Sequence, residues 1–347
     1  MTTKLRMLLL ACSGALSLVL AGGALAAFVP TISVGTQPPT AGSTGTISIR
    51  VVVPRDDDAL FRAQIFAPPG YRGNLAAAVG TQVGTVAAQV QVREPIAGAV
   101  LPITGTILVA DPATYVTQAA QCTGSATHAT TWVLVLQAAG TELRVPVFVD
   151  PAPAELAPLA SHVLNVCLPS PHLPVSSGGA TFGAKLIDAR LNTRGVFTAP
   201  ATTGTYRWHL IATPWPNGPG LPNAAGTVNA QGVVGLPGTV SVRATSRRGV
   251  VTVTGRLVEG ATPIAGRPVT VRFRNRNFTA RTNAAGSFRL VRRAPRGRSV
   301  TIRATANVPQ RPSTTCSFQS PFPTVPTCVS ETRGFFVVTR TIRHRVR

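Results

Sequence analysis

The sequence predicts an all-β protein of two or three tandem β-sandwich domains that follow a signal peptide. Short runs of β-branched residues, bounded by Gly, Pro, Asn and Thr, recur about every ten residues. Helical periodicity is nearly absent over the same length. The N-terminus carries two basic residues, an apolar run and a small-residue cleavage sequence in that order.

The N-terminal segment predicts export. Lys4 and Arg6 precede an apolar run over 7–20, and Ala24-Leu25-Ala26 supplies the small residues that a signal peptidase reads. The run is shorter than the roughly 20 residues of a membrane span, and no basic stop-transfer cluster follows it. We therefore expect residues 1–26 to be removed, leaving a secreted, extracellular or cell-envelope protein with no transmembrane span.

The cysteines predict two disulfides. Four cysteines follow the signal segment, and an even number in an exported chain indicates disulfide pairs. Three pairings are open, and proximity in sequence favours Cys122 with Cys167 and Cys316 with Cys328. No CxxC occurs and only five His are present, which argues against a zinc site built on Cys and His. We expect no metal and no cofactor. Lipidation at Cys12, or retention of the signal segment, stays open as an alternative.

A first β-sandwich domain is predicted over 27–150. Its expected strands cover 45–53, 62–67, 83–92, 103–110, 130–137 and 143–149. One stretch, 111–120, opens with Asp-Pro and predicts a short connecting helix.

The middle of the chain predicts a linker and a second β-rich segment. Residues 151–160 are Pro-rich, which indicates a stiff connection. The segment 161–237 follows, with strands expected at 162–168, 184–192 and 205–213. A disulfide between Cys122 and Cys167 would tie this segment to the first domain.

The last third, 238–347, predicts a basic β-sandwich with a Cys-closed insert. The insert, 309–330, contains Cys316 and Cys328, and we expect it to form a surface loop. The expected strands are 239–245, 250–258, 268–274, 277–282, 287–292, 300–306 and 334–342.

Part of this third resembles a known kind of module. The run VTVTGRLVEGATPIAGRPVTVRF and the later RTNAAGSFRL, within 239–306, resemble bacterial immunoglobulin-like and carboxypeptidase-regulatory-like modules. The resemblance implies spacers, adhesive stalks or accessory modules, and no catalytic residue. It completes the predicted fold as two or three tandem immunoglobulin-like β-sandwich domains. The whole chain also resembles exported proteins of high-GC bacteria.

The charge is concentrated in the last third. The formal net charge is +22 at pH 7. Residues 27–239 contain ten Lys and Arg against nine Asp and Glu, whereas 240–347 contain 21 Arg against Glu259 and Glu331. This asymmetry indicates an anionic partner. Codon bias would explain Arg in place of Lys, but not why Asp is absent after Asp188.

Seven arginines are candidate anion-binding residues. On the expected strand, Arg272, Arg274 and Arg276 share one face by period two. Guanidinium groups bind phosphate or carboxylate in bidentate fashion. Export makes an anionic envelope polymer or a protein the expected partner and disfavours nucleic acid; the oligomeric state stays open. The further candidates are Arg292, Arg293, Arg296 and Arg298. A solvated basic face without a ligand is the alternative interpretation.

The sequence predicts a non-catalytic structural, adhesive or binding protein. It has no G-x-S-x-G or H-E-x-x-H motif and few carboxylates, so we expect no enzyme. Trp215, in the Pro/Gly-rich loop 213–222, is a candidate for stacking on a sugar, and an accessory carbohydrate-binding protein is the first alternative. A hydrolase with a dispersed site is the second. Asp56-Asp57-Asp58 predicts a solvated loop, with calcium binding as its alternative.

Overall fold

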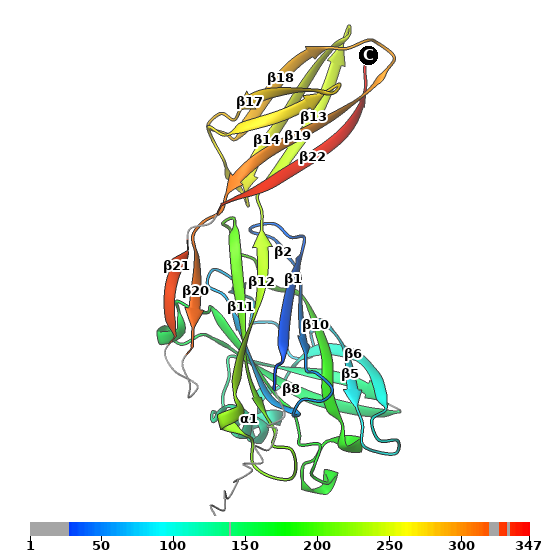
Figure 1. Cartoon of the computed structure of the whole chain (residues 1–347), viewed down its shortest axis with the longest axis vertical. Helices are drawn as coiled ribbons and strands as arrows, with labels where there is room; N and C mark the ends of the chain where they lie inside the picture. Colours follow the sequence, from blue (N-terminus) through cyan, green and yellow to red (C-terminus); the bar gives the residue numbers. More distant parts are fainter. Residues whose placement is uncertain (1–27, 139, 319–325, 332–333) are drawn as a thin grey trace, which may run out of the picture.

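The computed structural model describes residues 28–138, 140–318, 326–331 and 334–347. The predicted signal peptide, 1–26, lies outside the described residues. No helix in these ranges is long and apolar enough to cross a membrane. The chain forms two β-rich bodies that lie end to end, with the C-terminus at the far end of the second (Figure 1).

The first body contains strands β1 to β12 and one short α-helix. α1 (Val116–Thr123) follows a 3-10 turn, Pro112–Tyr115, whose N-cap Asp111 accepts a hydrogen bond from the Ala113 N–H. This confirms the helix expected after Asp-Pro. The strands are β1 (Thr31–Gln37), β2 (Thr44–Val52), β3 (Leu60–Ala67), β4 (Arg72–Gly73), β5 (Gln82–Gln91), β6 (Val100–Ala110), β7 (Thr130–Ala138), β8 (Thr141–Pro151), β9 (His162–Cys167), β10 (Lys185–Thr198), β11 (Gly204–Pro214) and β12 (Val228–Leu236).

These strands form one 12-stranded sheet that curls toward a barrel. The hydrogen-bonded order is β1-β2-β10-β5-β6-β7-β8-β9-β3-β11-β12, with β4 paired to β10. The two ends of this order approach each other, because β1 lies beside β12. Gly232 permits the approach: a Cβ there would lie 3.0 Å from the Ile32 carbonyl oxygen. One apolar core lines the interior and includes Trp132, Phe197 and Trp208.

The predicted division of this region into 27–150 and 161–237 is not observed. β10, from the second segment, pairs with β2 on one side and β5 on the other. β9 and β11 flank β3 in the same sheet. The Pro-rich segment 151–160 therefore connects neighbouring strands of a single body. Pairings this distant in sequence leave no local signal, so strand spacing alone suggested two sandwiches.

The Cys122–Cys167 disulfide joins α1 to the end of β9. α1 covers the outer face of the sheet, where Tyr115, Cys122 and Phe148 form a small apolar cluster. Because β9 belongs to the same sheet as β7 and β8, the disulfide fixes the helix on its own body. The predicted pairing is confirmed, but it joins no separate domains.

The second body is a sandwich of two four-stranded sheets. One contains β13 (Thr239–Arg247), β14 (Val250–Glu259), β15 (Thr262–Pro263) and β18 (Ser287–Arg293). The other has the order β17-β16-β19-β22. Its strands are β16 (Pro268–Phe273), β17 (Arg276–Arg281), β19 (Ser299–Pro309) and β22 (Phe335–Arg345). Inward residues alternate along the strands and share one core, as in Val269, Val271 and Phe273.

The predicted insert is a docked hairpin. β20 (Ser313–Ser317) and β21 (Thr327–Glu331) pair with each other, and the Cys316–Cys328 disulfide links them, as predicted. The hairpin leaves the second body and packs on the first, beside β11 (Figure 1). Cys316 is buried there in a cluster with Phe66 and Ile211. The insert is therefore an anchor and not a free surface loop, because its apolar side chains are covered by the first body.

A buried carboxylate holds the junction between the bodies. Oε1 of Glu259 accepts hydrogen bonds from the Thr203 N–H at 2.5 Å and the Thr203 hydroxyl at 2.8 Å. Arg311 donates to Oε2 at 3.1 Å. At Gly260, φ is +57° and a Cβ would lie 2.9 Å from the Ala201 carbonyl oxygen, so the bodies approach closely. The chain crosses this junction after β12, after β19 and before β22.

Replacing Glu259 with alanine should destabilise the protein by about 1–3 kcal/mol, because it leaves the buried Thr203 N–H without an acceptor. Urea unfolding at pH 7 measures the loss, and Glu142→Ala, which removes an exposed partner of Arg144, is the matched control with little effect. Burial raises the pKa of Glu259, but hydrogen bonds from Arg311 and Thr203 outweigh it and place the pKa below the ordinary 4.5.

A depressed carboxyl pKa means that the folded protein binds fewer protons than the unfolded chain. The stability that Glu259 contributes should therefore be full above pH 4.5 and lost as the pH falls through the folded pKa. A gap between wild type and Glu259→Ala that stays constant from pH 7 to pH 3 would contradict this assignment.

His209 predicts a second pH effect. It is 1 % exposed on β11 beneath the hairpin, with its ring 5.6 Å from that of Phe318. Burial lowers its pKa to about 4 from 6.5, so between these values the unfolded chain binds a proton that the folded protein does not. Stability should fall as the pH drops through this window, by up to roughly 3 kcal/mol. The free energy of unfolding of His209→Gln, measured at pH 7, 5.5 and 4, should depend less on pH than that of the wild type. Parallel pH dependence of the two proteins would contradict the assignment to His209.

Candidate anion-binding site

Both outer faces of the second body carry arginines, because the strands place every second residue in solvent. On one sheet, Arg243 and Arg289 flank Thr254, and Arg247 and Arg293 flank Val250, in register across three strands. On the other sheet, the exposed arginines are Arg272, Arg276, Arg281, Arg303, Arg340, Arg343 and Arg345.

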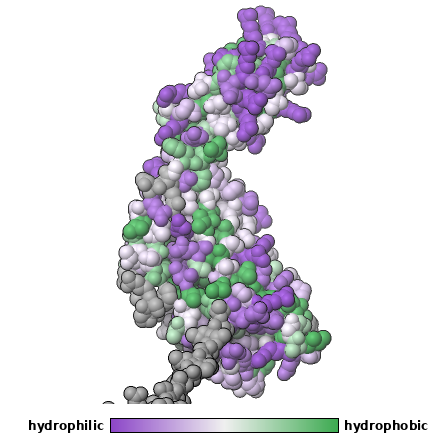
Figure 2. Space-filling model, viewed as in Figure 1, coloured by the Kyte–Doolittle hydropathy of each residue, from purple (hydrophilic) through white to green (hydrophobic). Residues whose placement is uncertain are grey.

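Exposed arginines gather at the end far from the first body, where Arg248, Arg345 and Arg347 lie beside four others. We call Arg247, Arg293, Arg296 and Arg298 the distal arginine cluster. Backbone hydrogen bonds bring its segments together: Ala294 N–H donates to Gly249 O, Gly297 N–H to Val346 O, and Val346 N–H to Arg298 O. Hydrophilic residues cover this end of the molecule (Figure 2).

The side-chain carboxylates of the second body lie at the opposite end. Glu259 is paired with Arg311 at the junction. Glu331, on the hairpin, is 3.5 Å from Arg207 of the first body. The distal arginine cluster therefore has no side-chain carboxylate from its own body nearby.

The predicted stripe of Arg272, Arg274 and Arg276 is wrong. β16 ends at Phe273, and the chain reverses through Arg274 and Asn275, whose φ angles are 47° and 66°. Two consecutive positive φ values make a tight hairpin turn of the kind that Asn favours. Arg272 stays on the outer face, Arg274 lies in the turn, and Arg276 begins β17 opposite Phe273. The turn breaks the period-two alternation on which the prediction rested.

The remaining candidates are separated by the fold. Arg293, Arg296 and Arg298 belong to the distal arginine cluster. Arg292 is half-buried, and its guanidinium lies 4.0 Å from the centroid of the Phe278 ring. Arg292 therefore packs over the edge of the core, whereas Arg293, Arg296 and Arg298 extend into solvent.

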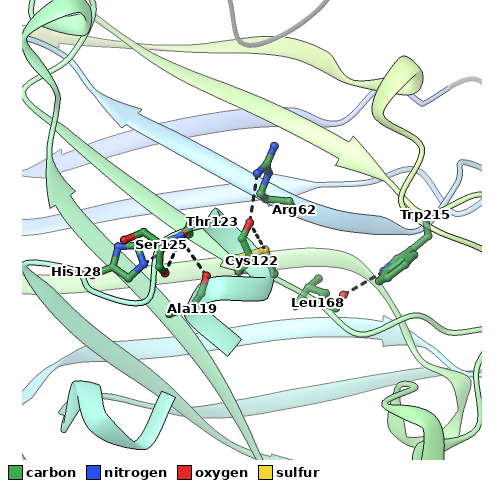
Figure 3. Close-up of a disulfide and its surroundings, with 9 residues drawn as sticks. Arg62, Ala119, Cys122, Thr123, Ser125, His128, Leu168 and Trp215 are labelled. Atoms are coloured by element: carbon green, nitrogen blue, oxygen red, sulfur yellow. Dashed lines mark hydrogen bonds between the residues drawn. A yellow bond between two sulfur atoms is a disulfide. The ribbon is translucent and has the colours of Figure 1, made fainter. Parts of the chain in front are cut away.

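Trp215 is held in place by the first body. Its indole N–H donates to Leu168 O at 3.0 Å, and its ring is edge-on to Phe61 at 4.8 Å. Figure 3 shows Trp215 and Leu168 beside the Cys122–Cys167 disulfide. Trp215 is half-buried, in contrast to the exposed stacking platform expected from its loop.

The sequence missed one chain of polar groups. Nδ1 of His128 lies 2.6 Å from Oδ2 of Asp150. Its Nε2 lies 3.0 Å from Oγ1 of Thr123 (Figure 3). The order hydroxyl, imidazole, carboxylate is that of hydrolase triads. However, Thr123 Oγ1 also bonds Ala119 O and the Ser125 N–H at the end of α1, and none of the three residues lines either of the two large cavities. The arrangement fits a helix end better than a substrate site.

Asp56, Asp57 and Asp58 do not converge on a metal site. Asp57 is 8 % exposed and accepts a hydrogen bond from the Val29 N–H at 2.7 Å. Within the described residues, no group of three His, Cys, Asp or Glu side chains could hold a metal ion.

Comparison with known proteins gives little. No family model matches the sequence, and no curated protein matches it. One similar solved structure is a Ca2+-stabilized adhesin that helps an Antarctic bacterium bind ice, with 14% identity over 92% of this chain and 74% of that chain and a TM-score of 0.19. Another is a 1.5-MDa bacterial ice-binding adhesin, with 10% identity over 92% and 98% and a TM-score of 0.20. At these TM-scores neither comparison supports an argument.

The arginine faces predict a salt-dependent stability effect. Arg272 and Arg303 are direct cross-strand partners on the outer face, and like charges in this position repel. Arg303→Thr should stabilise the protein by about 0.2–1 kcal/mol at low salt, and the gain should shrink as salt screens the pair. Thermal unfolding at 20 mM and at 1 M NaCl measures this stabilisation. The electrostatic screening length is roughly 20 Å at the lower concentration and 3 Å at the higher. The control is Arg281→Thr, because Arg281 lies opposite Pro268 and not opposite another arginine. Its stabilisation should be smaller. Equal stabilisation by both variants would show that repulsion between Arg272 and Arg303 is not the cause.

Proposed function

We propose that the protein is a non-catalytic binding protein of the cell envelope or extracellular space, whose second body binds an anionic envelope polymer. The observation that carries the proposal is the separation of charge within that body. Its arginines cover the outer faces and the distal end, while Glu259 and Glu331 are paired at the junction. Guanidinium groups without internal carboxylate partners are available for phosphate or carboxylate groups of a polymer.

Two further properties support this proposal. Two disulfides suit an oxidising compartment outside the cytoplasm. The docked hairpin and the Glu259 contacts hold the second body firmly, so that its distal end is displayed away from the first. A rigid display of charge loses less conformational entropy on binding than a flexible tail would.

The two alternatives have weaker support. Carbohydrate stacking depended on an exposed Trp215, and its indole is engaged by Leu168 and Phe61. Hydrolysis would depend on Thr123, His128 and Asp150, which hold the end of α1 and line neither large cavity.

Replacing the distal arginine cluster with serine should abolish most binding to isolated cell walls. The full chain should bind at 50 mM NaCl and release progressively toward 1 M, because screening weakens the contacts. The variant Arg247→Ser, Arg293→Ser, Arg296→Ser, Arg298→Ser should bind at least about tenfold more weakly, since each arginine supplies charged hydrogen bonds.

The matched control removes the same charge elsewhere. Arg55, Arg72, Arg190 and Arg194 are exposed on the first body, and their replacement with serine lowers the net charge by the same amount. This variant should bind nearly as the wild type does. Equal losses in both variants would show that only net charge matters, and negligible binding by the wild type would refute the proposal.

A further inference from the structure

The first body contains a large apolar cavity that the proposed function does not use. Its volume is about 800 Å3, within the roughly 300–1,000 Å3 of small-molecule sites. It lies at the end of the near-barrel where β3, β5, β8 and β10 present their lining residues, including Ile65, Val86, Val145 and Leu191. Its polar lining residues are Gln118, Gln121, Arg144, Thr181 and Lys185.

Small side chains create the space. Ala88 of β5 and Ala189 of β10 are direct cross-strand partners, and both line the cavity. The next inward pair along these strands is Val86 with Leu191, which is much bulkier. Close packing is the norm in protein interiors, so a pair of alanines at this depth leaves volume that neighbouring side chains do not fill.

A proline opens the wall beside the cavity. The ladder between β8 and β9 covers 147–151 of β8 and stops before Pro146, which has no N–H to donate. Pro146 and Val145 both line the cavity next to this end of the ladder. Leu221 also lines the cavity, and its side chain is 87 % exposed. An apolar group that enters from solvent would contact it first.

Both charged residues that line the cavity are cationic, and Arg144 is paired with Glu142, which lies outside the lining, at 2.7 Å. Arg144 and Lys185 are its charged lining residues, and no carboxylate lines it. The Lys185 ammonium donates to Arg55 O and to Asp57 O, the latter at 3.0 Å, which uses two of its three protons. The nearby acidic residues Asp56 and Asp58 face a separate polar pocket of about 440 Å3 that shares Lys185 with this cavity.

We propose that this cavity binds a long-chain carboxylate, with the unbranched acyl chain among the aliphatic residues and the carboxylate at the Lys185 and Arg144 rim. The chain gains by leaving water, at about 0.8 kcal/mol for each buried CH2. The head group gains a charge-assisted hydrogen bond from the remaining Lys185 proton, which a quaternary ammonium head cannot accept.

Calorimetric titration of the full chain with dodecanoate, below its micelle concentration, tests the proposal. We expect saturable one-to-one binding. Dodecyltrimethylammonium, with the same chain and the opposite charge, should bind at least about tenfold more weakly, as should hexanoate, which buries six fewer carbons. Failure to bind dodecanoate, or equal binding of the cationic amphiphile, would overturn the proposal.

Variants locate the site. Ala88→Phe should fill the cavity and reduce dodecanoate affinity at least about tenfold; Ala189→Leu is a milder second filling variant if Ala88→Phe does not fold. Ala87→Phe places the same side chain on the exposed face of the same strand and should bind as wild type does. A folded filling variant with unchanged affinity would overturn the assignment.

The rim is tested separately. Arg144→Met and Lys185→Met should each weaken dodecanoate binding while leaving dodecan-1-ol unchanged, and Arg194→Met, on β10 outside the cavity, should change neither. If a variant lost affinity for both dodecan-1-ol and dodecanoate, the substitution would have damaged the cavity itself. If dodecanoate affinity were unchanged, the claim that these side chains bind the carboxylate would be wrong. None of these positions belongs to the distal arginine cluster, so the outcome is independent of binding to cell walls.

Discussion

Curling of the 12-stranded sheet, which brings its two edge strands together, is the constraint on which the rest of the structure depends. A sheet of this length would leave unpaired N–H and C=O groups along both edges. Here the edge strands β1 and β12 approach each other, and Gly232 permits it because a side chain would meet the β1 backbone. Curling also turns one face of every strand inward, which buries Trp132, Phe197 and Trp208 in a common core.

The interior of the curled sheet has two contrasting regions. At one end, large aromatic rings fill the interior in edge-to-face contacts, such as Tyr71 with Trp208 at 5.1 Å. At the other, the strands carry Ala88 and Ala189, and the interior stays partly empty. The outer surface then accepts two disulfide-linked elements, α1 and the β20–β21 hairpin, each covering an apolar patch.

The β20–β21 hairpin restricts movement of the second body relative to the first. A single linker after β12 would leave the second body free to swing. Instead the chain returns to the first body through β20 and β21, and Glu259 binds Thr203 across the junction. The arginines of the second body are therefore carried on a braced support, and its carboxylates are used for bracing and not for neutralising that charge.

The sequence alone determined what depends on neighbouring residues: the all-β class, the helix after Asp111, most strands of the second body and the excess of arginine. It favoured both disulfide pairings by proximity but left the other pairings open. Tertiary structure alone decided that β10 inserts between β2 and β5, that the insert docks on the first body, and that His128 meets Asp150. The turn at Arg274 and Asn275 was a local signal that strand periodicity obscured. The long-range contacts could not be predicted, because hydrogen bonds between distant strands and the burial of apolar patches depend on which surfaces meet. Alternation along one strand shows which face is turned inward but not which strand pairs with it.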